Sequence, residues 1–283
     1  MLRRTRRPLE VRVGRPDDAA AVRRLLASTP RRLAYSEPWE LYLGKETALL
    51  TWQGERLVGA LIAHVDAGPV AWVRVAALAS GLGMGAWMDR VLPPLATGLW
   101  RARARMLAWA DVGGWAGTAL QRRGFRRSNR LITLVKEDWF LPPLPTVPFA
   151  LRPAREGEIA GLVRLDHAAF TPPWWLGPHT LLRMVHRAAC FLVADHEGRC
   201  IGYVEGHRVR QGAHIGRLAV DPAFQERGVG GWLLAGALRR LWQQGAQRVT
   251  LNTQEDNLRS RRLYARFGFH PTGRPIDVWE RLI

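Results

Sequence analysis

Hydrophobic and polar positions in the second half of the chain follow a regular series of strand and helix patterns. Residues 155–169, for example, repeat apolar side chains such as Ile159, Leu162 and Leu165 on one side of a helix. The pattern predicts strands at 149–152, 190–194, 199–210, 214–220, 248–253 and 277–283, and helices at 155–169, 178–187, 229–244 and 257–267. Because strands and helices do not alternate strictly, the order predicts an α/β fold with a mixed sheet.

The first half of the chain carries a weaker copy of the same pattern. Residues 122–125 (RRGF) recur at 266–269 (RFGF), and residues 83–87 (GMGAW) recur at 228–232 (GVGGW), at shifts of 144 and 145. Two further segments match in the same order at a shift of 143. Four matches in one order predict a single fold used twice.

A proline-rich segment separates the two copies. It holds Pro142, Pro143, Pro145 and Pro148, and proline interrupts both helices and central strands. We therefore expect a first domain at 1–140, a linker at 141–148 and a second domain at 149–283.

Charge is the least ordinary feature of the composition. The 283 residues include 42 Lys and Arg against 24 Asp and Glu, a net charge of +18, which favours anionic partners. Lys45 and Lys136 are the only lysines, and the arginines are scattered, not gathered in a basic stripe. We therefore do not expect a nucleic-acid partner.

The two cysteines, Cys190 and Cys200, are too few for a disulfide framework or a cysteine-rich zinc site. We expect a cytoplasmic protein without a metal. The most apolar region, 70–88, contains Arg74 and a glycine-rich break, so no membrane partner is expected either.

A glycine loop lies between the strand at 214–220 and the helix at 229–244. In it, Gln225, Gly228 and Gly230 follow a Gln-x-x-Gly-x-Gly spacing. Glycines let the main chain approach an anion, and the free N–H groups at the start of a helix bind phosphate. The loop indicates a phosphate site, with a tight packing turn as the alternative.

The helix at 257–267 carries a polar face. Asn257, Ser260 and Tyr264 are spaced by three and four residues and so lie on one side of it. Taken alone, Tyr264 would be interpreted as a packed aromatic residue with a solvated hydroxyl.

Together, the two motifs resemble those of the GNAT (Gcn5-related N-acetyltransferase) superfamily. The resemblance covers the second copy and, in weakened form, the first, and implies two tandem GNAT-type domains. In that family the glycine loop binds the pyrophosphate of acetyl-coenzyme A (acetyl-CoA), and the preceding strand pairs with its pantetheine arm. The coenzyme-binding residues that the resemblance implies are Leu218, Ala219, Val220, Gln225, Glu226, Arg227, Gly228, Val229, Gly230, Gly231, Asn257 and Ser260.

The resemblance also implies roles in the reaction. The N–H group of Leu218 would polarise the thioester carbonyl, and Tyr264 would protonate the departing thiolate. A general base is harder to assign. His214 stands where histone-acetylating members carry a glutamate, and Glu205 and His207 lie on the neighbouring strand. Alternatively, each is a solvated strand residue, and some members use only a chain of waters.

The first copy departs from the family pattern. Leu120 stands at the place of Tyr264, and Gly113 at that of Asn257. We expect 1–140 to be a degenerate GNAT-like domain without the acid, and 149–283 to be the catalytic one. The first domain would be a structural lobe that completes the acceptor cleft, or would retain some coenzyme binding.

Residues 170–175 (FTPPWW) give one indication of the acceptor. They resemble the Phe-x-x-Pro-Trp stretch of family members that acetylate protein N-terminal amines. We expect this stretch to line the acceptor cleft, with a hydrophobic plug over the core as the alternative.

The expected activity is transfer of an acetyl group from acetyl-CoA, as co-substrate, to a primary amine by direct attack. The acceptor would be a small molecule or a peptide N-terminus, and the protein a monomer or a homodimer. The alternatives are a non-catalytic acyl-CoA-binding or regulatory protein, a nucleic-acid-binding protein, and a tandem GNAT protein that uses another acyl donor, such as aminoacyl-tRNA.

Overall fold

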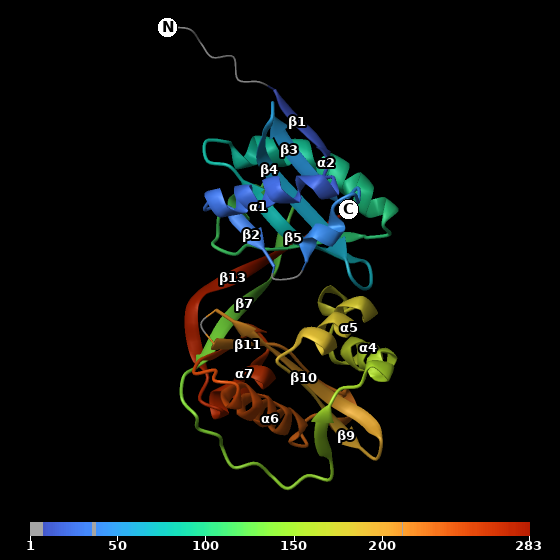
Figure 1. Ribbon diagram of the computed structural model, residues 1–283, viewed down its shortest axis with the longest axis vertical. Helices are drawn as coiled ribbons and strands as arrows, with labels where there is room; N and C mark the ends of the chain where they lie inside the picture. The colour runs from blue at the N-terminus through green and yellow to red at the C-terminus, as the bar shows by residue number, and fades with distance from the viewer. Residues whose placement is uncertain (1–7, 36–37, 211) are drawn as a thin grey trace. The chain divides into compact units, whose positions relative to one another are not determined.

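The computed structural model describes residues 8–35, 38–210 and 212–283, so the first seven residues of the predicted first domain lie outside the described residues. The chain forms two compact units (Figure 1). Unit 1 comprises residues 1–129 and 276–283, and unit 2 comprises residues 130–275. Each unit is built on a mixed sheet with helices, which confirms the predicted fold class.

Unit 2 has the strand order β7-β12-β11-β10-β9-β8. Only β11 and β12 run parallel; the other neighbouring strands are antiparallel. Its strands are β7 (Arg126–Lys136), of which residues 130–136 belong to this unit, β8 (Ala150–Pro153), β9 (Cys190–His196), β10 (Arg199–Val209), β11 (Gly212–Val220) and β12 (Val249–Gln254). Its helices are α4 (Ile159–Ala169), α5 (Pro178–Arg187), α6 (Val229–Gln243) and α7 (Leu258–Arg266).

Unit 1 repeats this plan, as the internal repeat predicts. Its strand order is β1-β3-β4-β5-β6-β13, with β5 and β6 parallel and β2 added to β5. Its elements are β1 (Leu9–Val13), α1 (Ala19–Ser28), β2 (Arg32–Ala34), β3 (Ala48–Gln53), β4 (Arg56–Val65), β5 (Val70–Leu78), α2 (Met84–Arg101), β6 (Met106–Ala110), α3 (Gly117–Gln121) and the end of β13 (His270–Leu282).

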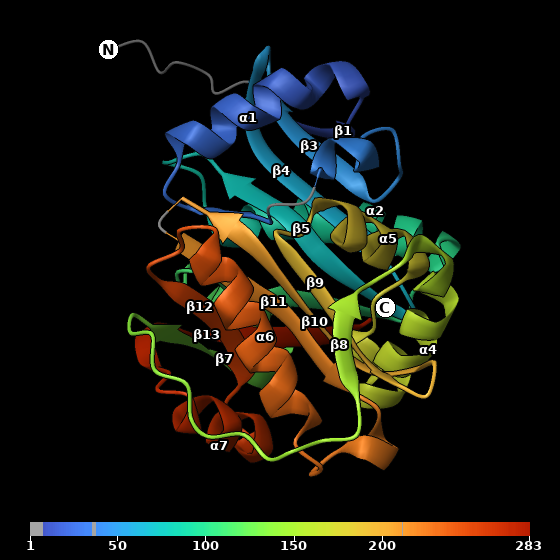
Figure 2. The same ribbon diagram turned by 60° about the horizontal axis from the view of Figure 1, so that its bottom comes forward.

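The sheet of unit 2 is covered on both faces. Helix α6 packs along β9, β10 and β11 (Figure 2), and its apolar side chains, including Leu234 and Leu238, are fully buried there. Helices α4 and α5 cover the other face around Tyr203 and Leu162. Burial of these side chains is the main stabilising term of the unit.

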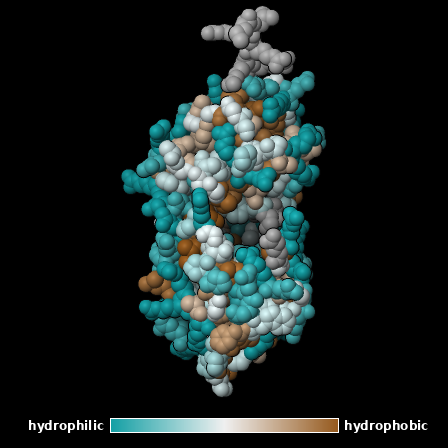
Figure 3. All heavy atoms as spheres, turned by 90° about the vertical axis from the view of Figure 1, so that its left-hand side faces the viewer, coloured by the Kyte–Doolittle hydropathy of each residue, from teal (hydrophilic) through white to brown (hydrophobic). Residues whose placement is uncertain are grey.

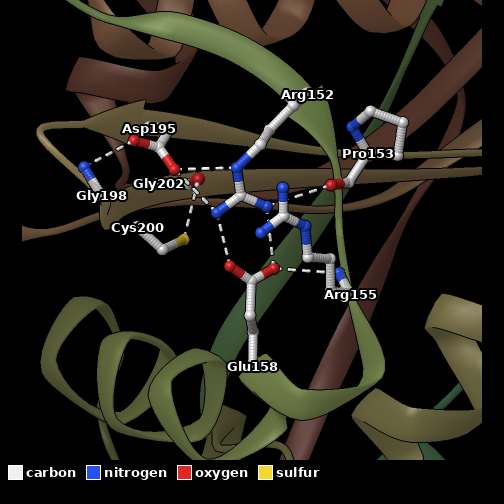
Figure 4. A network of polar contacts seen from close by, with 8 residues as sticks. All are labelled: Arg152, Pro153, Arg155, Glu158, Asp195, Gly198, Cys200 and Gly202. Carbon is white, nitrogen blue, oxygen red and sulfur yellow. Dashed lines mark hydrogen bonds and ion pairs between the residues drawn. The ribbon is translucent and has the colours of Figure 1, made fainter.

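A charged network fixes α4 to the sheet (Figure 4). The Arg152 guanidinium on β8 is bonded to Glu158, in the turn before α4, and donates from Nε to Asp195 Oδ2 on β9 at 2.8 Å. These bonds lower the pKa of both carboxyl groups. Glu158 also accepts from the main-chain N–H of Arg155, so the network orients the start of the helix.

The last strand departs from the predicted arrangement. Residues 277–283 were expected to close the second domain, but Val278–Leu282 of β13 pair with Met106–Ala110 of β6 in unit 1. In unit 2, residues 131–136 of β7 pair with β12 instead. Unit 1 therefore contains the end of β13, from the second half of the sequence, and unit 2 contains part of β7, from the first half. The predicted domain boundaries stay a prediction, because the units do not follow a single cut in the chain.

The proline-rich segment lies against unit 2. Leu141 and Leu144 pack on its core, and the main-chain oxygens of Pro143 and Pro145 accept hydrogen bonds from α7 and α6. The segment therefore packs along the start of α6 and forms part of the structure of unit 2.

The face shown in Figure 3 is mostly hydrophilic, with smaller groups of hydrophobic atoms. Among the described residues, no helix combines the length and the apolar character needed to cross a membrane.

Candidate active site

A cavity opens in unit 2 where β11 separates from β12. The two strands pair only over Ala213–Ile215, whereas β11 stays paired with β10 as far as Val220. A β-bulge at Gly216 lies at the point of separation, and such a bulge bends and twists its strand. In the described pairing, residues 217–220 of β11 therefore do not pair with β12, and their main-chain edge on that side is open. An extended ligand can pair with such an edge as an added strand.

The cavity has a volume of about 520 Å³, within the range typical of small-molecule sites. Its walls come from β11, the start of α6, α7 and the end of α4. They are Ala169, Phe170, Leu218, Ala219, Val220, Gln225, Glu226, Gly228, Gly230, Gly231, Asn257, Arg259, Ser260, Arg262, Leu263 and Arg266. Ten of the twelve predicted coenzyme-binding residues are among them.

The start of α6 is shaped by glycine. Gly228 precedes the helix with φ +85°, a left-handed conformation that side chains disfavour. A Cβ atom there would lie 3.0 Å from Pro145 Cγ. The first N–H groups of the helix have no partner within it, and Gly230 and Gly231, which have no side chain, line the cavity there. The cradle fits a diphosphate.

The loop before the helix is fixed by polar contacts. Gln225 donates from Nε2 to the main-chain oxygen of Val220 at 3.1 Å, and its Oε1 accepts from Arg259. Glu226, with φ +64°, pairs with the same arginine at 3.2 Å. Arg259 therefore joins α7 to the loop.

Two predicted coenzyme residues lie outside the cavity wall. Val229 is 1% exposed and packs in the core, so only its main-chain N–H group is available to a ligand. The Arg227 guanidinium lies over the Phe224 ring, 5.6 Å from its centroid, and its side chain is exposed.

Helix α7 places two of the three residues of the predicted polar face, Asn257 and Ser260, at the cavity. The Asn257 side chain caps the helix by accepting from the Ser260 N–H at 3.0 Å, and both residues line the cavity. Tyr264 is 7% exposed and packs edge-on against Phe269 in the core. Burial raises the pKa of Tyr264 to about 12, so its hydroxyl keeps its proton at neutral pH. Tyr264 is not among the lining residues.

The base candidates form one polar cluster on the sheet face that carries α4 and α5. Glu205 is 3% exposed and its Oε1 lies 2.9 Å from His207 Nδ1. This hydrogen bond raises the pKa of His207. The rings of His207 and His214 are 5.5 Å apart, and His214 Nδ1 lies 2.9 Å from Thr250 Oγ1. Burial, and to a lesser degree His207, lower the pKa of His214 to about 4.

A buried ion pair next to this cluster was not predicted. Asp166 on α4 is fully buried and accepts from Arg217 Nε and Nη2, both at 2.9 Å, and from the Tyr203 hydroxyl at 2.5 Å. Arg217 directly precedes Leu218, the predicted carbonyl-polarising residue. The sequence offers two signals for this pair. Asp166 interrupts the apolar pattern of a helix, and Arg217 falls at an inward-facing position of a strand.

The same arginine fixes the predicted acceptor loop. Arg217 Nη2 donates to the Trp174 main-chain oxygen at 2.6 Å, and its guanidinium lies 3.6 Å from the Phe170 ring centroid. Trp175 Nε1 donates to the Phe170 main-chain oxygen at 2.8 Å. Phe170 lines the cavity, so this loop forms part of the wall and is held rigidly.

The corresponding place in unit 1 has different contacts. Arg31 donates to the main-chain oxygens of Ala79 and Leu82, in the loop before α2, and Leu82 packs against the core. Leu120, at the place of Tyr264, is completely buried. Within the described part of the chain, no three His, Cys, Asp or Glu side chains gather as a metal site would require.

The chain is similar to known proteins. The Acetyltransferase (GNAT) family matches residues 159–269. A mycothiol acetyltransferase of Nocardia farcinica is 30% identical over 292 residues, 93% of each chain. A mycothiol acetyltransferase of Brachybacterium faecium is 28% identical over 205 residues, and the match spans 62% of this chain but only 61% of that protein. A tandem GNAT protein from the clavulanic acid biosynthesis pathway has the same fold, with a TM-score of 0.68 at 16% identity over 97% of this chain and 98% of its own.

Proposed function

The chain belongs to the GNAT acetyltransferase family, and we propose that unit 2 transfers an acetyl group from acetyl-CoA to a primary amine. The observation that carries the proposal is the cavity between the open edge of β11 and the starts of α6 and α7. It offers a diphosphate cradle at Gly228–Gly231 and an extended edge at 218–220. Acetyl-CoA has the matching order of chemical groups: a diphosphate, then an extended pantetheine arm that ends in the thioester.

The reaction is a direct transfer. The amine nitrogen attacks the thioester carbon, an N–C bond forms, and the C–S bond breaks. One amine proton leaves to a base, and the coenzyme thiolate takes up a proton. The N–H group of Leu218 stabilises the oxyanion that develops on the carbonyl, because the bulge at Gly216 turns this part of β11 away from β12.

Tyr264 supplies the proton to the thiolate. Its elevated pKa, about 12, keeps the hydroxyl protonated, so it is available as an acid throughout the neutral range. Asn257 and Ser260, on the same helix face, line the cavity, where they would contact the coenzyme between the diphosphate and the thiol.

We assign the role of base to Glu205, with His207 as the group that exchanges the proton with solvent. The carboxylate is buried and hydrogen-bonded to His207, whose side chain is 34% exposed. His214 is the weaker candidate, because a pKa of about 4 makes it a poor proton acceptor at neutral pH.

The acceptor approaches along the rigid 170–175 loop. Of this loop, Phe170 lines the cavity, and a small amine and a peptide N-terminus both suit an aromatic wall. Two relatives are named mycothiol acetyltransferase, so amines of the mycothiol type belong among the candidates. We further propose a cytoplasmic location and a monomer or homodimer.

The test is an amine-panel assay with the full chain, acetyl-CoA and detection of the released thiol. The panel spans small-molecule amines, mycothiol-type amines and peptides with free N-termini. At least one amine should release thiol in proportion to acetylated product. If the coenzyme binds and no amine releases thiol, the protein is a coenzyme-binding module, and if acetyl-CoA does not bind at all, the donor is a different one.

A further inference from the structure

Three arginines of helix α7 also line the cavity. Arg259, Arg262 and Arg266 are spaced by three and four residues, so they lie on one side of the helix, and all three line the cavity. Glu226 is the only acidic residue among the lining residues. Three guanidinium groups against one carboxylate leave the wall with a net charge of +2 (3 − 1).

The three arginines differ in what they contact. Arg259 is bonded to Gln225 and Glu226 in the loop before α6, and Arg266 donates from Nη2 to the Pro143 main-chain oxygen at 2.9 Å. Arg262 is exposed, and its side chain makes no hydrogen bond or ion pair with any other described residue. It is therefore a cation at the cavity wall that the described part of the protein does not neutralise.

We propose that Arg262 binds a phosphate monoester on the ribose of the donor nucleotide, at a site separate from the diphosphate cradle. The proposal rests on the proposed function, because it assumes a coenzyme A thioester as donor. The start of α6 already supplies main-chain N–H groups and a positive helix end for a diphosphate. A second anionic group explains why a further guanidinium, the group best matched to phosphate oxygens, faces the same cavity.

The test compares two ligands that differ only in this phosphate. The full chain is titrated by calorimetry, at one low salt concentration, with coenzyme A and with 3′-dephospho-coenzyme A. The wild-type protein should bind coenzyme A about fivefold to tenfold more tightly, the range expected for an exposed pair strengthened by bidentate geometry. In Arg262→Gln this ratio should fall to about twofold or less, with little change in the Kd of the dephosphorylated ligand.

Arg261→Gln is the matched control. Arg261 is the preceding residue of the same helix, is not a lining residue, and donates from Nη1 to the Glu255 main-chain oxygen at 2.9 Å. This variant removes the same charge and should keep the wild-type ratio.

Three results would overturn the proposal while coenzyme binding itself persists: equal wild-type affinities for the two ligands, an equal loss for both in Arg262→Gln, or the same change of ratio in Arg261→Gln. An equal loss would place Arg262 on the diphosphate. Failure of both ligands to bind the wild-type protein would instead contradict the proposed function.

Discussion

Tyr264 is the residue on which the proposed chemistry depends most. Replacing it by phenylalanine removes the proton donor but keeps the ring that packs on Phe269. Turnover should fall by about 10²–10⁴-fold, the usual contribution of a general acid, while the Kd for acetyl-CoA stays nearly unchanged. Steady-state kinetics and calorimetry on the same preparation measure both. An active Tyr264→Phe variant would show that another group protonates the thiolate.

His214 gives a second prediction for a single residue, which concerns the pH dependence of the free energy of unfolding. Its pKa is about 4 in the folded protein and about 6.5 in an unfolded chain. Between these values the unfolded state binds more protons, so the contribution of His214 is complete above about pH 6.5 and is lost as the pH falls toward 4. The loss amounts to at most about 3 kcal/mol.

Urea unfolding at pH 7 and pH 4.5 measures this loss. His214→Asn should lose less stability between the two pH values than the wild-type protein does. An identical loss in both proteins would mean that other groups carry the pH dependence, such as Glu158 and Asp195, whose pKa values are lowered in the folded protein.

Single residues were predictable from sequence where they belong to a local motif. Gly228, Asn257 and Tyr264 each fall within a short stretch whose spacing indicates a helix start or a helix face. Asp166 and Arg217 are 51 residues apart, and only the packing of α4 on β11 brings them together. No local pattern encodes that contact, so the buried pair had to come from the structure.

Among the secondary-structure elements, the start of α6 affects both the stability of the backbone and the proposed coenzyme binding. Gly228→Ala should destabilise the protein by about 1–2 kcal/mol, because alanine is strained at φ +85°, and should weaken coenzyme binding because the added Cβ presses on Pro145. Thermal unfolding and calorimetry measure the two effects.

Gly245→Ala is the matched control for this variant. Gly245 has the same φ of +85° just after α6, and no atom lies within 4 Å of the position of its Cβ. The control should lose similar stability and keep the wild-type coenzyme Kd. If both variants bind the coenzyme as the wild-type protein does, the cradle is not at Gly228.

Most element boundaries were predictable because the hydrophobic period changes sharply between strands and helices. Helix α5 begins and ends at the predicted residues, and α6 ends one residue earlier. Strand β13 begins at His270, seven residues before the predicted start. Pro271, Gly273 and Pro275 argue against a strand there, yet proline is tolerated where its missing N–H group is not required by a neighbour.

At the scale of the whole molecule, the pairing of the terminal strands has consequences for the first unit. Deleting residues 276–283 removes the strand that pairs with β6 beside the fully buried Trp109. Unit 1 should lose at least about 3 kcal/mol, because buried side chains on both strands become exposed. Urea unfolding followed by tryptophan fluorescence measures the loss.

Leu282→Ala is the control for the deletion. Leu282 is 73% exposed, so this substitution should change stability by less than about 0.5 kcal/mol. A deletion variant as stable as the wild-type protein would contradict the strand pairing. The sequence repeat predicted two copies of one fold but not this pairing, because a strand pattern does not specify its partner.

A crystal structure of the full chain with acetyl-CoA would show directly whether unit 2 binds the donor in this cavity. The diphosphate should contact the main-chain N–H groups at 228–231, and the thioester should lie between the Leu218 N–H group and the Tyr264 hydroxyl. Coenzyme bound at any other place, with this cavity empty, would contradict the account.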